Sequence, residues 1–345
     1  MNRLPTISII IPCYNVDQYI SQCVESVLSQ NYPHLEIICV NDGSTDSTLE
    51  LLKDYASKDL RIKILSQINA GLSSARNAGI ENSTGEFIMF VDADDWLEEN
   101  TLQVITEKKV PVDLICFSYN RIFANKIQPR KLGLDGNFDS ALIQRRMVGL
   151  LDEELVDPSQ TDSLITAWGK LYNSDIIKKK AILFIDTKII GTEDALFNIN
   201  YLEFAHTVTI IDKPLYNYRK TNLISLTNTY KYELFEKWKV LFSKIDEFKE
   251  GKNADFNRAL QNRICLSVIG LGLNETFSNK SSIEKRYKLN EIISDPLYIR
   301  AFSNLNLKYF PFHWKVFFYF AKNKKILPVV QMLKVINFII NRKNQ

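Results

Sequence analysis

The chain has 345 residues, of which 46% are hydrophobic and 24% charged, with a formal net charge of +3. This length is enough to bury a full core in two domains or in one enlarged domain. No run approaches the roughly 18 apolar residues of a membrane span, and no Lys/Arg-led apolar leader precedes Ile7. We therefore expect neither a membrane-spanning helix nor a secretory signal.

Cysteine usage indicates the compartment. The five cysteines are odd in number and scattered, without the spacing of a disulfide framework or a zinc site. We expect them to be reduced, buried, small hydrophobic residues of a cytoplasmic protein.

Strands and helices are predicted to alternate along the first third of the chain. Runs of β-branched residues predict strands that are buried on both faces, and apolar residues three and four apart predict helices. The short connections favour a right-handed, mostly parallel α/β sheet flanked by helices. In chain order we expect strand 7–12, helix 17–30 with Asp17 as its N-cap, strand 35–42, helix 48–56, strand 61–66, helix 71–82 and strand 86–92.

Polar residues follow each of these strands, at the edge of the sheet where ligands of parallel sheets bind. No G-x-G-x-x-G follows the first strand and no P-loop lysine motif is present, which disfavours a dinucleotide-binding domain and a P-loop nucleotidase. An acidic edge can still bind a phosphorylated ligand through Mg²⁺ or Mn²⁺. Asp42 could accept a hydrogen bond from the N–H of a uracil, since a carboxylate only accepts.

The segment "FVDADDWL" places three carboxylates within four positions. Asp92 and Asp94 are expected to face a cation and a nucleotide. Asp95 precedes "WLEENTLQVI", whose apolar spacing fits a helix, so we expect Asp95 to be its N-cap. An EF-hand is excluded, because the glycine and glutamate of that loop are missing.

Further along the chain, periodicity weakens and the predictions are coarser. We expect a strand at 112–123, a loop or hairpin at 128–139, and helix with acidic loops around 140–165. "GTEDALF" has the pattern of a helix start, with Thr192 as a cap and two acids in the first turn.

Five motifs now stand in order: "SIIIPCYN", "VNDGSTDST", "NAGLSSARNAG", "GEFIMFVDADDW" and "GTEDALF". Over roughly residues 6–225 the chain resembles the family 2 glycosyltransferases with the GT-A fold. The resemblance implies an inverting enzyme that moves a sugar from a nucleotide diphosphate, commonly UDP, to a hydroxyl group.

The resemblance also assigns roles to residues of the donor site. Those expected to hold the nucleoside are Pro12, Tyr14, Asn15 and Asp42. Asn69 and Arg76 would lie near the nucleoside or the diphosphate, and Arg219 or Lys220 could reach the diphosphate, although an exposed basic loop explains them equally well. Asp92-Ala93-Asp94 matches the D-x-D motif, with Asp94 the principal ligand of Mn²⁺ or Mg²⁺ and Asp92 nearer the ribose or the metal.

The resemblance likewise assigns acceptor-side roles. Inverting transfer needs one carboxylate to remove the acceptor proton, and the family pattern points to Asp194, with Glu193 in a positioning role. In "AWGKLY", Trp168 could stack on a sugar and Lys170 could touch the acceptor or a phosphate. The alternatives are a core tryptophan and a structural lysine, and the two interpretations are about equal.

We expect a catalytic domain over 1–227, with a nucleotide-sugar half at 1–110 and an acceptor half at 111–227, and a helical region over 228–345. Residues 296–345 contain nine Lys and Arg and no Asp or Glu, interleaved with aromatic and aliphatic residues. This composition favours an anionic membrane surface over nucleic acid. A packed helical layer or a dimer partner explains it equally well.

The leading hypothesis is a metal-dependent transferase of cell-surface polysaccharide synthesis, acting on a saccharide or lipid-linked acceptor at the inner face of the cell membrane. Two alternatives remain. One is a non-catalytic sugar-nucleotide-binding subunit of an assembly complex. The other is a nucleotidyltransferase, which would need a Gly-rich basic loop where the chain has "PCYNVDQY". A homo-oligomer is left open.

Overall fold

The structure, a computed structural model, describes residues 4–107, 112–222 and 229–344. It consists of two compact units that interleave in sequence. The first unit comprises Met1–Ile143, Ile165–Thr187 and Glu193–Asn222, and the second comprises Gln144–Leu164, Lys188–Thr192 and Leu223–Gln345. The predicted domain boundary at residue 227 is thus close to the last change of unit, while 144–164 and 188–192 group with the C-terminal helices.

The first unit contains a mixed sheet of ten described strands, in the order β3-β2-β1-β4-β9-β6-β10-β5, with β7 beside β6 and β8 beside β10. Four consecutive strands are parallel: β3 (Ile62–Ser66), β2 (Leu35–Asn41), β1 (Ile7–Cys13) and β4 (Phe87–Phe90). This confirms the α/β fold and the parallel first half. Every residue of β1 and β2 is buried, as expected for strands that are covered on both faces.

The second half of the sheet mixes directions. β9 (Lys170–Asn173) runs antiparallel to β4 and to β6 (Leu114–Phe123), whereas β10 (Thr207–Arg219) runs parallel to β6. The segment predicted as a loop or hairpin contains β7 (Lys126–Arg130) and β8 (Gly136–Asp139), which pair with β6 and β10 and not with each other.

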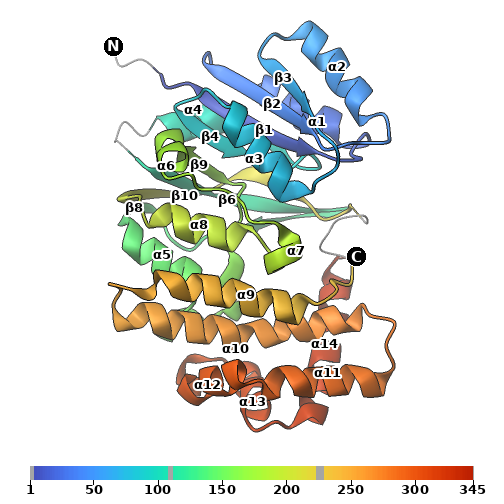
Figure 1. Ribbon diagram of the computed structural model, residues 1–345, viewed down its shortest axis with the longest axis vertical. Coiled ribbons are helices and arrows are strands. Elements are labelled where there is room, and N and C mark those ends of the chain that lie inside the picture. The colour runs from blue at the N-terminus through green and yellow to red at the C-terminus, as the bar shows by residue number, and fades with distance from the viewer. Residues whose placement is uncertain (1–3, 108–111, 223–228, 345) are drawn as a thin grey trace. The chain divides into compact units, whose positions relative to one another are not determined.

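The helices of the first unit are α1 (Ile20–Leu28), α2 (Thr48–Lys58), α3 (Leu72–Asn82), α4 (Thr101–Thr106), α6 (Ser174–Lys179) and α8 (Asp194–Leu202); α5 (Ser140–Val148) and the short α7 (Thr187–Ile190) lie at the changes of unit. The first three follow the predicted order, and α6 and α7 were not predicted (Figure 1). α3 packs on β1 and β2, and a Cβ at Gly79 would lie 2.3 Å from Ile10 Cγ2. Only glycine permits this close approach of helix and strand.

Three predicted helix caps are wrong. Asp17 lies in a turn before α1, whose N-cap is Tyr19, and its backbone N–H donates to Asp46 Oδ2. The N-cap of α8 is Glu193 and not Thr192. Asp95 caps no helix, because Trp96–Leu97 form β5 and pair with β10, and α4 begins only at Thr101. Strand pairing has overridden the helical spacing there.

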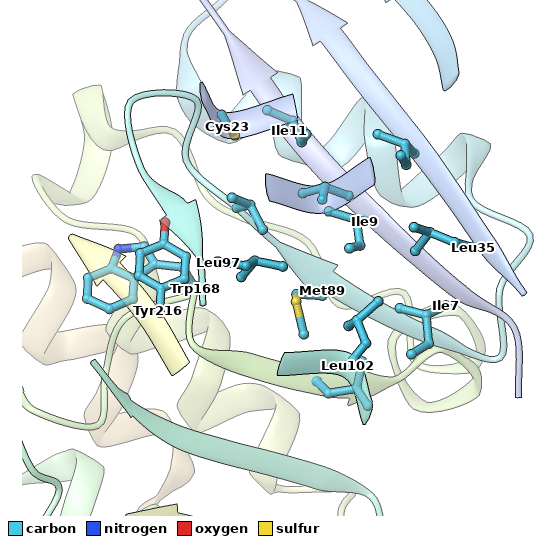
Figure 2. Packing of buried hydrophobic residues seen from close by; sticks show 14 of the residues in the cluster. Ile7, Ile9, Ile11, Cys23, Leu35, Met89, Leu97, Leu102, Trp168 and Tyr216 are labelled. Carbon is cyan, nitrogen blue, oxygen red and sulfur yellow. The ribbon is translucent and has the colours of Figure 1, made fainter. Parts of the chain in front are cut away.

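The main core of the first unit packs beneath β1, β2 and β4 and continues to β10. Figure 2 shows Ile7, Ile9 and Met89 in this cluster, with Leu97, Trp168 and Tyr216 at its other end. The five cysteines are free and buried, as predicted.

The described part of the second unit is helical. Short 3-10 turns at Asp152–Val156, Pro158–Asp162, Glu247–Lys249 and Leu307–Tyr309 accompany α9 (Leu234–Asp246), α10 (Ala254–Thr276), α11 (Ser282–Ser294), α12 (Pro296–Asn304), α13 (Phe312–Lys322) and α14 (Ile326–Asn344). The buried α10 is central, because it contacts α9, α11, α12 and α14. Within the described residues, none of these helices has the length and apolarity that a membrane crossing requires.

Candidate active site

A buried arginine joins two distant motifs. Arg76, on α3, is 1% exposed, and its Nη2 donates to Asp92 Oδ1 at 2.9 Å. Its Nη1 donates to Glu193 Oε1 and to Asp194 Oδ1, each at 2.8 Å. The D-x-D and the Glu-Asp pair therefore lie in one cluster. We call Arg76, Asp92, Glu193 and Asp194 the arginine cluster.

The charges of the arginine cluster do not balance. One guanidinium faces three carboxylates, which leaves two negative charges when all three are ionised. Burial lowers the pKa of Arg76, but the charges of Asp194, Asp92 and Glu193 outweigh burial and raise it above its ordinary value. Burial raises the pKa of Asp92. The cluster thus favours the arrival of a further cation.

The carboxylates of the D-x-D segment have different partners. Asp94 Oδ2 accepts from Asn222 Nδ2 at 2.8 Å. Asp95 is 1% exposed and accepts from the Tyr216 hydroxyl and from the Arg219 backbone N–H, each at 2.8 Å. The same Tyr216 hydroxyl accepts from the Asp92 N–H at 3.1 Å. Asp95 therefore ties β10 to the D-x-D segment, and burial raises its pKa well above its usual range.

Among the described residues, the D-x-D segment offers a divalent cation too few ligands by itself. Asp92 Oδ2 and Asp94 Oδ1 have no hydrogen-bond partner among the described residues. No group of three or more His, Cys, Asp or Glu in those residues could hold a metal. Mg²⁺ commonly binds one or two carboxylates together with the phosphates of its substrate. The donor set therefore suits a cation that bridges to a diphosphate.

Glu193 and Asp194 differ in environment. The Asp194 side chain is 22% exposed, and its Oδ2 accepts from the Ala167 backbone N–H at 3.0 Å. The Glu193 side chain is less exposed, and burial, with the neighbouring charge of Asp194, raises its pKa to about 7. Asp194 is the carboxylate of the pair that is more open to a ligand, and both of its oxygens are oriented by hydrogen bonds.

Asp42 is held at the end of β2 by a surrounding loop. Its Oδ1 accepts from Gln67 Nε2 at 2.7 Å and from the Ala70 N–H at 2.8 Å, and its Oδ2 accepts from the Gly71 N–H at 2.8 Å. Gly71 has φ 91°, a conformation that favours glycine. Asp42 is buried, and its carboxylate thus already has three donors.

The other residues expected to hold the nucleoside lie beside Asp42 at the ends of β1 and β3. Pro12 is inside β1, paired with Val40, and the ring of Tyr14 is 50% exposed beyond the end of that strand. Asn15 has φ 50°, and its Oδ1 accepts from the Thr45 N–H. Asn69 is exposed, next to Gly43. Of these residues, Tyr14, Asn15 and Asn69 are exposed.

Trp168 and Lys170 are less accessible than a direct acceptor contact requires. The Trp168 ring is 6% exposed, and one face lies parallel to Tyr216 at 4.6 Å between centroids. Lys170 is 2% exposed, its Nζ donates to the Thr166 carbonyl, and burial lowers its pKa. These positions favour the alternative interpretation of both residues, a core tryptophan and a structural lysine, while acceptor contact stays a prediction.

Arg219 is occupied by neighbours on the donor side. Its Nε donates to the Asp94 carbonyl at 2.7 Å, and its Nη2 donates to Gln22 Oε1. Its guanidinium lies over the rings of Trp96, at 4.7 Å, and Tyr19, at 5.0 Å. Contact of Arg219 with a diphosphate stays a prediction.

Two residues of this site were missed from the sequence. Tyr216 contacts Asp92 and Asp95 from 121 or more positions away, and Asn222 contacts Asp94 from 128. Only the alternation of β10, which places Tyr216 and Tyr218 on one face, could have indicated Tyr216. Asn222 follows the strand and carries no signal of its own.

Known proteins with similar sequences include glycosyltransferases and polysaccharide synthases. Residues 8–164 match the profile of Glycosyl transferase family 2. EpsH of Bacillus subtilis, an inferred glycosyltransferase, is 29% identical over 305 residues, 87% of this chain and 86% of EpsH. Hyaluronan synthase of Pasteurella multocida is 41% identical over 104 residues, 30% of this chain and 11% of that protein.

Among solved structures, residues 1–349 of S. aureus TarS in complex with UDP-GlcNAc align with a TM-score of 0.71 and 19% identity, over 96% of this chain and 91% of that one. At this identity the likeness shows the fold, a GT-A fold. The profile match and the glycosyltransferase relatives agree: residues 8–164 of this chain are similar to glycosyl transferase family 2, and the chain shares the fold of TarS.

Proposed function

We propose that this chain is a glycosyltransferase, which takes a sugar from a UDP-sugar and attaches it, with inversion, to a hydroxyl group of a saccharide or lipid-linked acceptor. The observation that carries the proposal is the arginine cluster, in which Arg76 binds carboxylates 16, 117 and 118 positions away. That UDP-GlcNAc binds TarS, which shares the fold, supports a UDP-sugar donor. The likeness to hyaluronan synthase supports a role in polysaccharide synthesis.

Asp194 is proposed as the general base. The acceptor oxygen forms a bond to the anomeric carbon while the bond from that carbon to the diphosphate oxygen breaks, and its electron pair leaves with UDP. The acceptor proton passes to a carboxylate oxygen of Asp194. Arg76 and the Ala167 N–H orient this carboxylate, and Glu193, which accepts from the same Nη1 of Arg76, positions the guanidinium. General-base catalysis of this kind contributes typically 10²–10⁴-fold.

The donor would lie with its nucleoside near Tyr14 and Asp42 and its diphosphate near Asp94. The free oxygens of Asp92 and Asp94 would hold Mg²⁺ or Mn²⁺, which when bound supplies positive charge to the departing diphosphate. The negative charge that Arg76 leaves uncompensated in the arginine cluster supports this. No acidic group is then needed to protonate the leaving group.

The second unit is proposed to contact an anionic membrane surface through α14. Leu327, Val335 and Phe338 are 55%, 57% and 65% exposed and recur at helical spacing. Lys334 and Arg342 fall on the same face, also exposed. Apolar side chains flanked by bases suit the interface between lipid headgroups and acyl chains. Such contact would bring the enzyme to a lipid-linked acceptor at the inner face of the cell membrane.

The test of the base is UDP release from UDP-sugars in the presence of Mn²⁺. Asp194→Asn keeps the shape of the side chain but removes the basic oxygen, so the rate is expected to fall about 10²–10⁴-fold. The matched control is Asp54→Asn, at an exposed carboxylate of α2, expected to stay within about twofold of wild type. Equal rates for wild type and Asp194→Asn would contradict the assignment, and failure of any nucleotide sugar to bind would contradict the whole proposal.

A further inference from the structure

Two basic side chains meet at the ends of β6 and β10. Arg121 lies in β6 opposite Tyr218 of β10, and Lys220 follows the end of β10. The Lys220 backbone N–H donates to the Ile122 carbonyl at 2.8 Å, which keeps the chain beside β6. The two strands are parallel, so both side chains stand at the edge of the sheet where ligands bind. We call Arg121 and Lys220 the cation pair.

The cation pair has no acidic partner within hydrogen-bond distance among the described residues. Arg121 Nε is buried without a hydrogen-bond partner, and its guanidinium lies 6.0 Å from the centre of the Tyr119 ring. Lys220 Nζ reaches only the Tyr218 hydroxyl, at 3.4 Å, and lies over that ring at 4.6 Å. Burial lowers the pKa of Lys220, and the charge of Arg121 lowers it further, against a weaker opposite effect of Asp95. Two partly buried like charges are costly until an anion joins them.

An aromatic surface connects the cation pair with the proposed base. Tyr218 lies against Trp168 at 5.3 Å between ring centroids. The residue before Trp168, Ala167, donates its N–H to Asp194 Oδ2. Aromatic rings offer an apolar face to the C–H side of a sugar. The partly buried Tyr218 thus contacts Lys220 of the cation pair and Trp168, whose preceding residue donates a hydrogen bond to Asp194.

The cation pair stands apart from the predicted donor contacts. Arg219 points toward the Asp94 carbonyl and Gln22. Neighbouring residues of a strand point to opposite faces, so Tyr218 projects away from Arg219, and Lys220 accompanies Tyr218. The diphosphate is expected beside Asp94, on the side where Arg219 lies.

We propose that Arg121 and Lys220 form a subsite for an anionic group of the acceptor, a phosphate or a carboxylate, while the acceptor sugar lies over Tyr218 with its hydroxyl at Asp194. The inference rests on the proposed function and specifies its acceptor as acidic. A guanidinium matches both anions with paired hydrogen bonds, and an ammonium adds a point charge. Neutral acceptors would leave the cation pair uncompensated.

The experiment uses the full chain saturated with UDP and Mn²⁺, so that the donor site is filled. Glucose 6-phosphate, glucuronate and glucose are titrated separately by calorimetry. At least one anionic probe is expected to bind ten or more times more tightly than glucose, and the stronger of the two identifies phosphate or carboxylate as the preferred group. Arg121→Met and Lys220→Met should each weaken that binding about tenfold, whereas Lys220→Arg should retain most of it. Lys53→Met, at an exposed lysine of α2, is the charge-matched control and should leave it unchanged.

The affinity for UDP, measured on the same samples, separates this inference from the proposed function. Wild type that fails to bind UDP contradicts the proposed function. Wild type that binds UDP but binds neither anion more tightly than glucose overturns the subsite. Variants of the cation pair that lose UDP affinity instead of probe affinity also overturn it, because the two residues would then serve the donor diphosphate.

Discussion

The arginine cluster and the C-terminal fifty residues differ in how their basic side chains are paired with acids. In the cluster, a fully buried guanidinium binds three carboxylates from distant parts of the chain. Residues 296–345 carry nine bases and no acid. Charges paired inside the chain fix the geometry of a site, whereas exposed bases with no acid in the same segment are available to an anionic partner. Each of the following experiments changes a charge in one of these two regions.

The largest effect is expected from Arg76→Met. The substitution leaves the buried Glu193 and the partly buried Asp92 and Asp194 without their cation, and breaking a buried pair in this way costs about 3–5 kcal/mol. Asp194 also loses its orientation, so UDP release should fall by more than about 10³-fold. Thermal denaturation and the UDP-release assay measure the two effects. Arg61→Met, which removes a partly exposed guanidinium bonded to Asp59, is the control and should cost about 1 kcal/mol or less. Equal losses in both variants would contradict a special role of the cluster.

Removal of the divalent cation tests whether the excess negative charge has a function. Chelation with EDTA is expected to lower UDP release on the order of 10²-fold, because the departing diphosphate loses several kcal/mol of stabilisation. Added Mn²⁺ should restore the rate of UDP release by the wild-type protein. Asp94→Asn should require far more Mn²⁺ for the same rate, while Glu99→Gln, an exposed acid nearby in the chain, should respond as wild type does. Full activity in EDTA would show that the cluster needs no added cation.

Neutralising the exposed bases tests the other side of the contrast. Binding to vesicles of anionic phosphatidylglycerol, measured by co-sedimentation, should weaken about 10³-fold when four lysines become glutamine, since each base near such a surface is worth about 1 kcal/mol. Vesicles of neutral phosphatidylcholine should bind weakly in either case. The four are Lys322, Lys324, Lys325 and Lys334, and the control quadruple, with the same loss of charge, is Lys53, Lys58, Lys179 and Lys188. Equal weakening by both sets would point to net charge alone, and monomer–dimer change without vesicle binding would point to a second copy of the chain.

The smallest effect concerns Glu193. Its pKa, about 7, lies above the ordinary value of 4.5 because of burial and the charge of Asp194. The folded protein therefore binds the proton more tightly than the unfolded chain, so this group makes stability fall as pH rises from about 4.5 to about 7. Glu193→Gln removes that fall. Its melting temperature, relative to wild type, should rise by a few degrees between pH 5 and pH 8. Glu50→Gln, at an exposed acid of α2, should show no such trend. If the difference in melting temperature between Glu193→Gln and wild type did not change with pH, the raised pKa of Glu193 would be contradicted.

The first half of the sheet could be predicted because its information is local. Ile7–Pro12 and Leu35–Val40 are runs of β-branched and apolar residues, which suit strands buried on both faces. Because these strands are parallel, the polar residues that follow them lie at one edge of the sheet. Asp42 and the D-x-D segment could therefore be placed together.

Caps and strand edges could not be predicted in this way. Asp95 precedes a stretch with helical spacing, yet Leu97 pairs with Tyr216 in β10, from a distant part of the chain. A strand partner that far away leaves no trace in the local pattern. Trp168 was equally suited to a sugar and to the core until Tyr216 covered its face.

The amino-acid sequence by itself therefore determined the parallel half of the sheet, the order of the motifs and the carboxylates that make the site. Only the tertiary structure decided how these residues are joined. Arg76 would be a solvated charge on an isolated helix, and it becomes the centre of the site because folding brings Asp92, Glu193 and Asp194 within 2.9 Å of it. Contacts between residues a hundred positions apart depend on how helices and strands pack, which local spacing does not encode.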